Sequence, residues 1–249
     1  MKEWLLYTFE SKIYVTHLME LLAALAGSIY IYLSKDKKND HRIFVRFLWS
    51  VLLIDIVGGY AGLAYFDNYE HFQFLKGTPF VRNNWYFNIA EVYFISFYSF
   101  FLMRKISSAP FRKILKRTII LYIIFAIINM YLADDFFGND VVINYIVGAF
   151  LILSTVFLYF FDMMMSDEVL SFYKRLTFYI AVGISISFLV RVPISIYNEF
   201  ITVENVEFNK VFFTVIRYSN VFIYTMFTLG FYMNYKHQQN HSTLELQKT

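Results

Sequence analysis

Charged side chains stand inside segments of this chain that are otherwise apolar. In the stretch YVTHLMELLAALAGSIYIYL, residues 14–33, His17 and Glu20 are three positions apart and therefore share one face of a helix. An imidazole and a carboxylate at this spacing can form an ion pair or contribute ligands to a metal ion. Further polar side chains lie inside other apolar segments, and they are Asp55, Asn88, Glu91, Arg191 and Arg217.

Motifs for catalysis or cofactor binding are missing from the sequence. A di-iron bundle uses Glu-x-x-His on each of two helices, whereas this chain has one such pair in the reverse order, so we predict no metal ligand. Nucleophile motifs, Gly-rich phosphate loops and zinc-protease signatures are absent, and there is no cysteine. We therefore expect no enzyme activity and no cofactor, and we expect no nucleic acid among the partners.

Composition indicates that membrane-spanning helices carry these side chains. The 249 residues are 58% hydrophobic and only 16% charged, whereas soluble domains average about 25% charged residues. The apolar runs are continuous, unlike the alternating strands of a membrane barrel. The expected spans are residues 12–33, 43–66, 85–103, 118–133, 141–161, 176–198 and 210–234, of which the fourth is the shortest. The sequence thus predicts an all-α, seven-transmembrane helix bundle as a single domain, 1–235, followed by a short polar tail, 236–249, that we expect to be disordered.

Basic residues gather in alternate connections, and this pattern predicts the orientation. The richest connection is RKISSAPFRKILKR, residues 104–117, which contains six cations and no acidic residue. By the positive-inside rule the N-terminus lies outside and the C-terminus lies in the cytoplasm. We therefore expect a multi-pass protein of the cell membrane. The basic segment is expected to contact anionic lipid headgroups or a cytoplasmic or membrane protein partner.

The intramembrane polar residues fall at similar depths below the outer boundary. Counting 1.5 Å per residue from the span ends places most of them roughly 5 to 12 Å below it. A charge facing lipid costs about 2.5 to 3.5 kcal/mol, so these side chains should face inward and pair. The predicted site is an outward-facing pocket for an unknown small ligand, formed by His17, Glu20, Asp55, Asn88, Glu91, Arg191 and Arg217. The alternative is that these groups only hold helices together.

Polar groups on one side of the membrane favour sensing over transport. The inner halves of the third, fifth and seventh spans are aromatic and aliphatic, so no polar route to the cytoplasm is evident. We interpret the chain as a receptor-like or sensory subunit that signals through partner chains. A small-solute transporter or channel subunit is the alternative. An offset of about 128 residues superposes the first three spans on the last three, as in transporters with parallel repeats and a linking helix.

Seven helices with an outside N-terminus resemble the layout of rhodopsins and of G-protein-coupled receptors. The residues that mark those families are not found here. Lys210 lies at the edge of the last span rather than in mid-membrane, and the third span ends FLMRK instead of carrying Asp-Arg-Tyr. The last span also lacks Asn-Pro-x-x-Tyr. The resemblance therefore concerns architecture, and no functional residue is carried over.

Overall fold

The chain is all-helical throughout the part described by the computed structural model, residues 2–34, 39–133, 136–166, 171–197 and 205–246. The α-helices are α1 (Lys2–Glu10), α2 (Ile13–Leu33), α3 (Asn39–Gly58), α4 (Tyr60–Phe66), α5 (Asn84–Met103), α6 (Ala109–Leu132), α7 (Val142–Met164), α8 (Leu176–Ile196) and α9 (Val206–Leu246). Short 3-10 turns are η1 (Gln73–Leu75), η2 (Pro79–Val81) and η4 (Phe172–Lys174).

Six helical segments of the described chain are long and apolar enough to cross a membrane. They are Ile13–Leu33, Asn39–Phe66, Asn84–Met103, Ala109–Leu132, Val142–Met164 and Leu176–Ile196. The second of them consists of α3 and α4, which are separated at Gly59. The seventh expected span, 210–234, lies within α9 but is not among the six. Its polar side chains, Arg217 and Asn220 among them, make it less apolar than the other spans.

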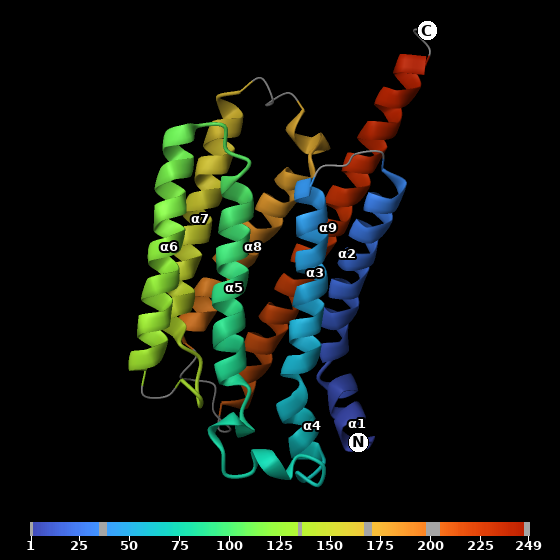
Figure 1. The fold of residues 1–249 in the computed structure, drawn as a ribbon. Coiled ribbons are helices and arrows are strands. Elements are labelled where there is room, and N and C mark those ends of the chain that lie inside the picture. The colour runs from blue at the N-terminus through green and yellow to red at the C-terminus, as the bar shows by residue number, and fades with distance from the viewer. Residues whose placement is uncertain (1, 35–38, 134–135, 167–170, 198–204, 247–249) are drawn as a thin grey trace.

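The long helices run side by side in one bundle (Figure 1). Contacts connect α2, α3, α5, α7, α8 and α9 in a closed circuit, because α9 packs on α2 as well as on α8. α6 packs against α5 and α7 at one edge. One end of the bundle carries α1, α4 and the 67–83 connection, and we call it the α1 end. At the opposite end α9 continues beyond the other helices.

Small residues on α2 allow α3 and α9 to approach this helix closely. Ala23, Ala24 and Gly27 of α2 are fully buried. A Cβ atom at Gly27 would lie 2.6 Å from Val45 of α3 and 2.8 Å from Phe231 of α9. This contact agrees with the packing role that small residues serve between membrane helices.

Aromatic side chains fill the bundle in the half away from α1. Phe47 stacks on Phe97 with ring centroids 3.7 Å apart, and Phe44 contacts Phe101 at 5.0 Å and Phe227 edge-on at 5.2 Å. Phe44 and Phe227 have no exposed surface. The aromatic core, which we define as Phe44, Phe47, Phe97, Phe101 and Phe227, therefore joins α3, α5 and α9 through dense ring contacts.

Two segments differ from the sequence-based expectation. The basic segment 104–117 is not a free loop, because α6 begins at Ala109 and includes most of its cations. Arg104 and Lys105 form ion pairs with Asp40, at 2.9 Å and 2.6 Å. The segment after residue 235, expected to be disordered, continues α9 as helix to Leu246, and residues 247–249 lie outside the described part.

Candidate functional site

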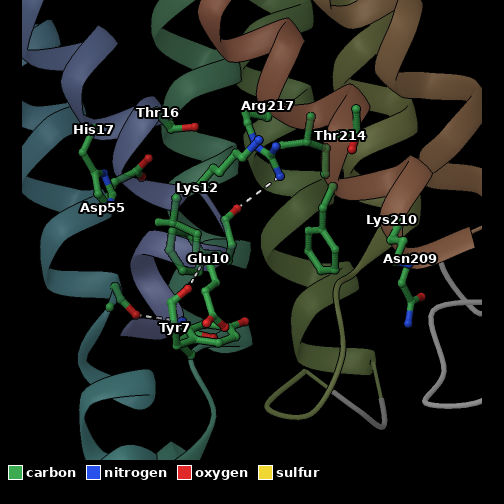
Figure 2. A pocket seen from close by; sticks show the side chains of 18 of the residues that line it. Tyr7, Glu10, Lys12, Thr16, His17, Asp55, Asn209, Lys210, Thr214 and Arg217 are labelled. Atoms are coloured by element: carbon green, nitrogen blue, oxygen red, sulfur yellow. Dashed lines mark hydrogen bonds between the residues drawn. The ribbon is translucent and has the colours of Figure 1, made fainter. Parts of the chain in front are cut away.

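The main cavity is a space of about 720 Å³ at the α1 end of the bundle. Residues from α1, α2, α3 and α9 line it, together with Asn83 and Phe87. Figure 2 shows His17 and Asp55 on one wall and Asn209 and Lys210 on the opposite wall. The break between α3 and α4 lies at its edge, where Gly58 and Gly59 contribute backbone rather than side chains.

One wall of the main cavity holds an acidic cluster formed by His17, Glu20 and Asp55. Each residue offers a nitrogen or oxygen atom, and the three atoms lie within 4.8 Å of one another. His17 Nδ1 is 3.4 Å from Glu20 Oε2, and Glu20 is 1% exposed whereas the His17 side chain is 32% exposed. The helical spacing of His17 and Glu20 on α2 brings both toward Asp55 of α3. The cluster is therefore accessible through His17 and Asp55, and Glu20 lies behind them.

The opposite part of the main cavity is basic. Arg217 of α9 donates from Nη2 to the carbonyl oxygen of Ser11 at 3.1 Å (Figure 2). Lys12, next in the chain, has a left-handed φ of 58°, which turns the chain from α1 into α2. Lys12 and Lys210 also line the cavity. A ligand there would meet these cationic groups as well as the carboxyl groups of Asp55 and Glu10.

A second cavity of about 230 Å³ contains the remaining predicted site residues. Asn88, Glu91 and Arg191 line it, and Phe87 lines both cavities. The predicted single pocket is thus two spaces: His17, Asp55 and Arg217 line the main cavity, with Glu20 behind its wall, and the other three residues line the second cavity. Phe87 packs tightly on α3, where a Cβ atom at Gly58 would lie 2.4 Å from its Cζ atom.

Neutral groups, rather than carboxylates, accept hydrogen bonds from Arg191 and Arg217. Arg191 Nη2 donates to Asn220 Oδ1, and Asn220 Nδ2 is 3.3 Å from Thr16 Oγ1. Within the described residues, neither Arg191 nor Arg217 forms an ion pair with Glu20, Asp55 or Glu91. The expected pairing of acids with arginines is therefore wrong, because the helices direct the Arg191 guanidinium to an oxygen on α9 and the Arg217 guanidinium to one in the connection between α1 and α2.

Two asparagines serve to hold segments together. Asn88 donates to the carbonyl oxygens of Phe136 and Asn139, at 3.1 Å and 3.0 Å, and accepts from the Val141 N–H at 2.9 Å. Asn144 accepts from Asn129 at 2.9 Å and donates to the Ala126 carbonyl oxygen at 3.2 Å. Since these amides are occupied by other parts of the chain, the expected glue role applies to them.

Several residues of the main cavity were not identified from the sequence, among them Thr16, Lys210 and Thr214. Helical spacing carried a signal for each of them. Thr16 precedes Glu20 by four positions, so both lie on one side of α2. Lys210 and Thr214 precede Arg217 by seven and three positions, which is one stripe of α9. The stripe does not stand out in the sequence, because a lysine near the end of a membrane helix usually extends its charged group to the membrane interface.

The fold and the two cavities define an all-helical, polytopic membrane protein with a polar site at one end of its bundle. Comparison with protein-family models, with curated proteins and with solved structures finds no match to this chain.

Proposed function

We propose that this protein is a receptor-like or sensory subunit of the cell membrane with seven spans. In this proposal α9 is the seventh span, the α1 end faces the outside and the C-terminal end of α9 lies in the cytoplasm. A small solute enters the main cavity from outside, and partner chains carry the signal further.

The observation that carries the proposal is a charged cavity at one end of a bundle whose other half is packed. The main cavity contains polar and charged groups of three long helices, whereas the aromatic core lies between it and the opposite end. A sensor needs access from one side only. A channel needs a continuous polar path, whereas the side chains of the aromatic core that contact one another between α3, α5 and α9 are apolar.

Helix α9 is suited to connect the cavity with a cytoplasmic output. Asn209 and Arg217 line the cavity, and the same helix continues to Leu246 beyond the bundle. Near this end the Tyr30 hydroxyl of α2 accepts from Asn234 at 3.2 Å and from Gln238 at 2.8 Å. Tyr30 is also 3.2 Å from His41 Nδ1, so it joins α2, α3 and α9. A ligand that shifts α9 at the cavity would therefore act on this network.

The basic face of α6 is the proposed contact with lipid headgroups or with a partner. Lys113, Lys116 and Arg117 are exposed on the first turns of α6, which follow the aromatic half of α5. Arg104 and Lys105 share the carboxylate of Asp40, and Arg112 donates to the carbonyl oxygens of Ile106 and Ser107. The three remaining cations therefore replace the full segment 104–117 as the proposed surface.

Single cysteines test the proposal directly, since the chain has none of its own. Thr214→Cys places a thiol in the main cavity, and Ser99→Cys places one at a fully buried position of α5, in the half of the bundle that contains the aromatic core. Each variant is exposed to a membrane-impermeant methanethiosulfonate in right-side-out and in inverted vesicles. We expect Thr214→Cys to react in right-side-out vesicles and Ser99→Cys to react in neither.

The other results contradict the proposal. Labelling of Thr214→Cys from the cytoplasmic side alone would mean that the cavity faces inward. Labelling of Ser99→Cys from either side would mean that the aromatic half opens to water, as transport requires. A denatured sample of each variant serves as the control for thiol reactivity.

A transporter subunit is the second candidate because the helix circuit has the order of a tandem repeat. Around the circuit α2, α3 and α5 are followed by α7, α8 and α9, and α6 packs outside it on α5 and α7. This is the order expected when two three-helix units have the same orientation and are joined by a linking helix. Labelling of Ser99→Cys in the vesicle experiment would favour this candidate.

A further inference from the structure

The acidic cluster lacks the positive charge that two neighbouring carboxylates require. Glu20 and Asp55 lie close enough to act on each other electrostatically, and no Lys or Arg among the described residues forms an ion pair with either. Arg191 acts on both from a distance, but it donates its hydrogen bond to Asn220. Buried like charges need a proton or a cation between them to be stable.

Glu20 provides a second observation that points to a ligand. Its side chain is 1% exposed, and its Oε1 atom is buried without a hydrogen-bond partner. A buried carboxylate oxygen without a donor is unfavourable. The Tyr224 hydroxyl lies beside the Glu20 carboxyl group and can orient it, as outer-shell groups orient metal ligands.

We propose that His17, Glu20 and Asp55 bind a divalent transition-metal ion, with Zn²⁺ as the best-matching ion, at the wall of the main cavity. One imidazole nitrogen and two carboxylate oxygens form a ligand set that Zn²⁺ accepts. Two carboxylates and one divalent cation sum to zero charge, which suits a site within the bundle. Solvent or a solute in the main cavity completes the coordination shell.

The spacing of the three side chains fits a single ion. Zinc binds nitrogen and oxygen at about 2.0 to 2.2 Å, so two ligands of one ion lie at most about 4.4 Å apart. The separation of 3.4 Å between His17 Nδ1 and Glu20 Oε2 is within this limit, and all three ligand atoms are within 4.8 Å. Small side-chain rotations bring the third atom into range. His17 and Asp55 line the main cavity, so the ion has an entry path.

The chain offers an internal control with the same residue types. Asp67, Glu70 and His71 also place three ligand atoms within 4.8 Å, but Glu70 and His71 are exposed on the 67–83 connection. In that group Asp67 Oδ2 already accepts from the His71 N–H at 2.9 Å. Water competes for every ligand there, so this second group should bind Zn²⁺ weakly.

The test uses the full-length protein, purified in detergent and freed of metal by chelation. We expect added Zn²⁺ to be retained at about one ion per chain after desalting and to raise the midpoint of thermal unfolding, whereas Mg²⁺ does neither. His17→Asn and Asp55→Asn should lower the Zn²⁺ affinity by more than the 10- to 100-fold loss that is typical of outer-shell changes. His71→Asn should leave the affinity unchanged.

A folding defect can be separated from a loss of metal binding. Without metal, Glu20→Gln and Asp55→Asn remove repulsion between neighbouring carboxylates, so these variants should unfold at the wild-type temperature or above it. Their response to Zn²⁺ should nevertheless be lost. Three results would overturn the inference: no Zn²⁺ retained by the wild type, a response that survives His17→Asn, or stability that changes with pH but not with Zn²⁺.

This inference rests on the proposed function in one respect, the entry of the ion through an outward-facing cavity. The two can fail separately. Zinc binding in detergent does not depend on orientation, whereas labelling of Thr214→Cys does not depend on metal. Labelling from outside without Zn²⁺ binding would leave the sensory proposal intact and reject the metal site.

Discussion

At the scale of single residues, the buried polar groups of this bundle are of two kinds. The side-chain amides of Asn88 and Asn144 each donate to and accept from neighbouring parts of the chain. Glu20, by contrast, keeps a buried oxygen without a donor, and Arg191 keeps a buried Nε without an acceptor. Satisfied amides stabilise helix contacts. Unsatisfied charged groups are where a ligand or a change of conformation can supply the missing partner.

Replacement of Asn144 by alanine should lower stability. It removes the acceptor of Asn129 Nδ2 and the donor to the Ala126 carbonyl oxygen. Interhelical hydrogen bonds and buried unpaired groups have effects of about 1 to 2 kcal/mol, so the thermal unfolding midpoint should fall. Asn84→Ala is the matched control, because its bond to Asp140 is exposed to solvent. Equal effects of the two substitutions would show that burial does not decide the outcome.

The titrations of Asp67 and His71 should be coupled, with the two pKa values shifted in opposite directions. Hydrogen bonds from the His71 N–H and then from its ring lower the pKa of Asp67, and the bond to Asp67 raises the pKa of His71 above its ordinary value of 6.5. The His71 contribution is therefore present at low pH and lost as pH rises through the raised pKa. The Asp67 contribution is lost as pH falls through the lowered pKa. NMR titration should show the His71 pKa returning toward 6.5 in Asp67→Asn, and an unchanged value would exclude the interaction.

At the scale of helices, close packing depends on where small residues lie. Gly27→Ala should destabilise the protein by about 1 to 3 kcal/mol, the range for overpacking, because the new Cβ atom meets Val45 and Phe231 below 3.0 Å. Gly62→Ala is the control, since its nearest neighbour, Trp4 Nε1, is 3.4 Å away. Alanine favours helix over glycine, so Gly62→Ala should be neutral or slightly stabilising. Thermal unfolding of both variants checks this, and a destabilised Gly62→Ala would contradict it.

Helix positions could be predicted from the sequence better than helix ends. Every expected apolar stretch overlaps a long helix. In a membrane the backbone of a continuous apolar run must form its hydrogen bonds within the segment, and a helix does this. The start of α6 at Ala109 was missed because its first turns are basic and its hydropathy is low. The helical continuation of α9 to Leu246 was missed for the same reason. Hydropathy reports the apolar part of a helix and says little about its polar ends.

At the scale of the whole molecule, the convergence of polar residues from different helices could be predicted, but their division between two cavities could not. Distance along a helix gives depth, and His17, Asp55 and Arg217 do line one cavity. The rotation of each helix about its axis decides which side chains meet, and it depends on packing that the sequence does not reveal. For this reason Arg191 reaches Asn220 rather than Glu91, and Phe87 lies at both cavities.

The number of spans has a consequence for the two ends of the bundle. With six spans, the residues before α2 and the last turns of α9 lie on the same side of the membrane, whereas with seven spans they lie on opposite sides. The first residues of α1 and the last turns of α9 lie at opposite ends of the bundle (Figure 1), which fits a seventh crossing. α9 packs along α8 and α2 over the same bundle, so its polar Arg217 faces the main cavity rather than lipid.

Three cysteine variants at surface positions determine the parity of the crossings. Gln73→Cys lies in the connection before α5, Ser107→Cys in the connection before α6, and Asn240→Cys near the end of α9, and all three positions are exposed. With seven spans and an outside N-terminus, an impermeant thiol reagent labels Gln73→Cys in right-side-out vesicles and the other two only in inverted vesicles. If α9 does not cross, Asn240→Cys reacts from the same side as Gln73→Cys. An inverted orientation exchanges all three results. The basic residues at the start of α6 predict that Ser107 lies on the cytoplasmic side.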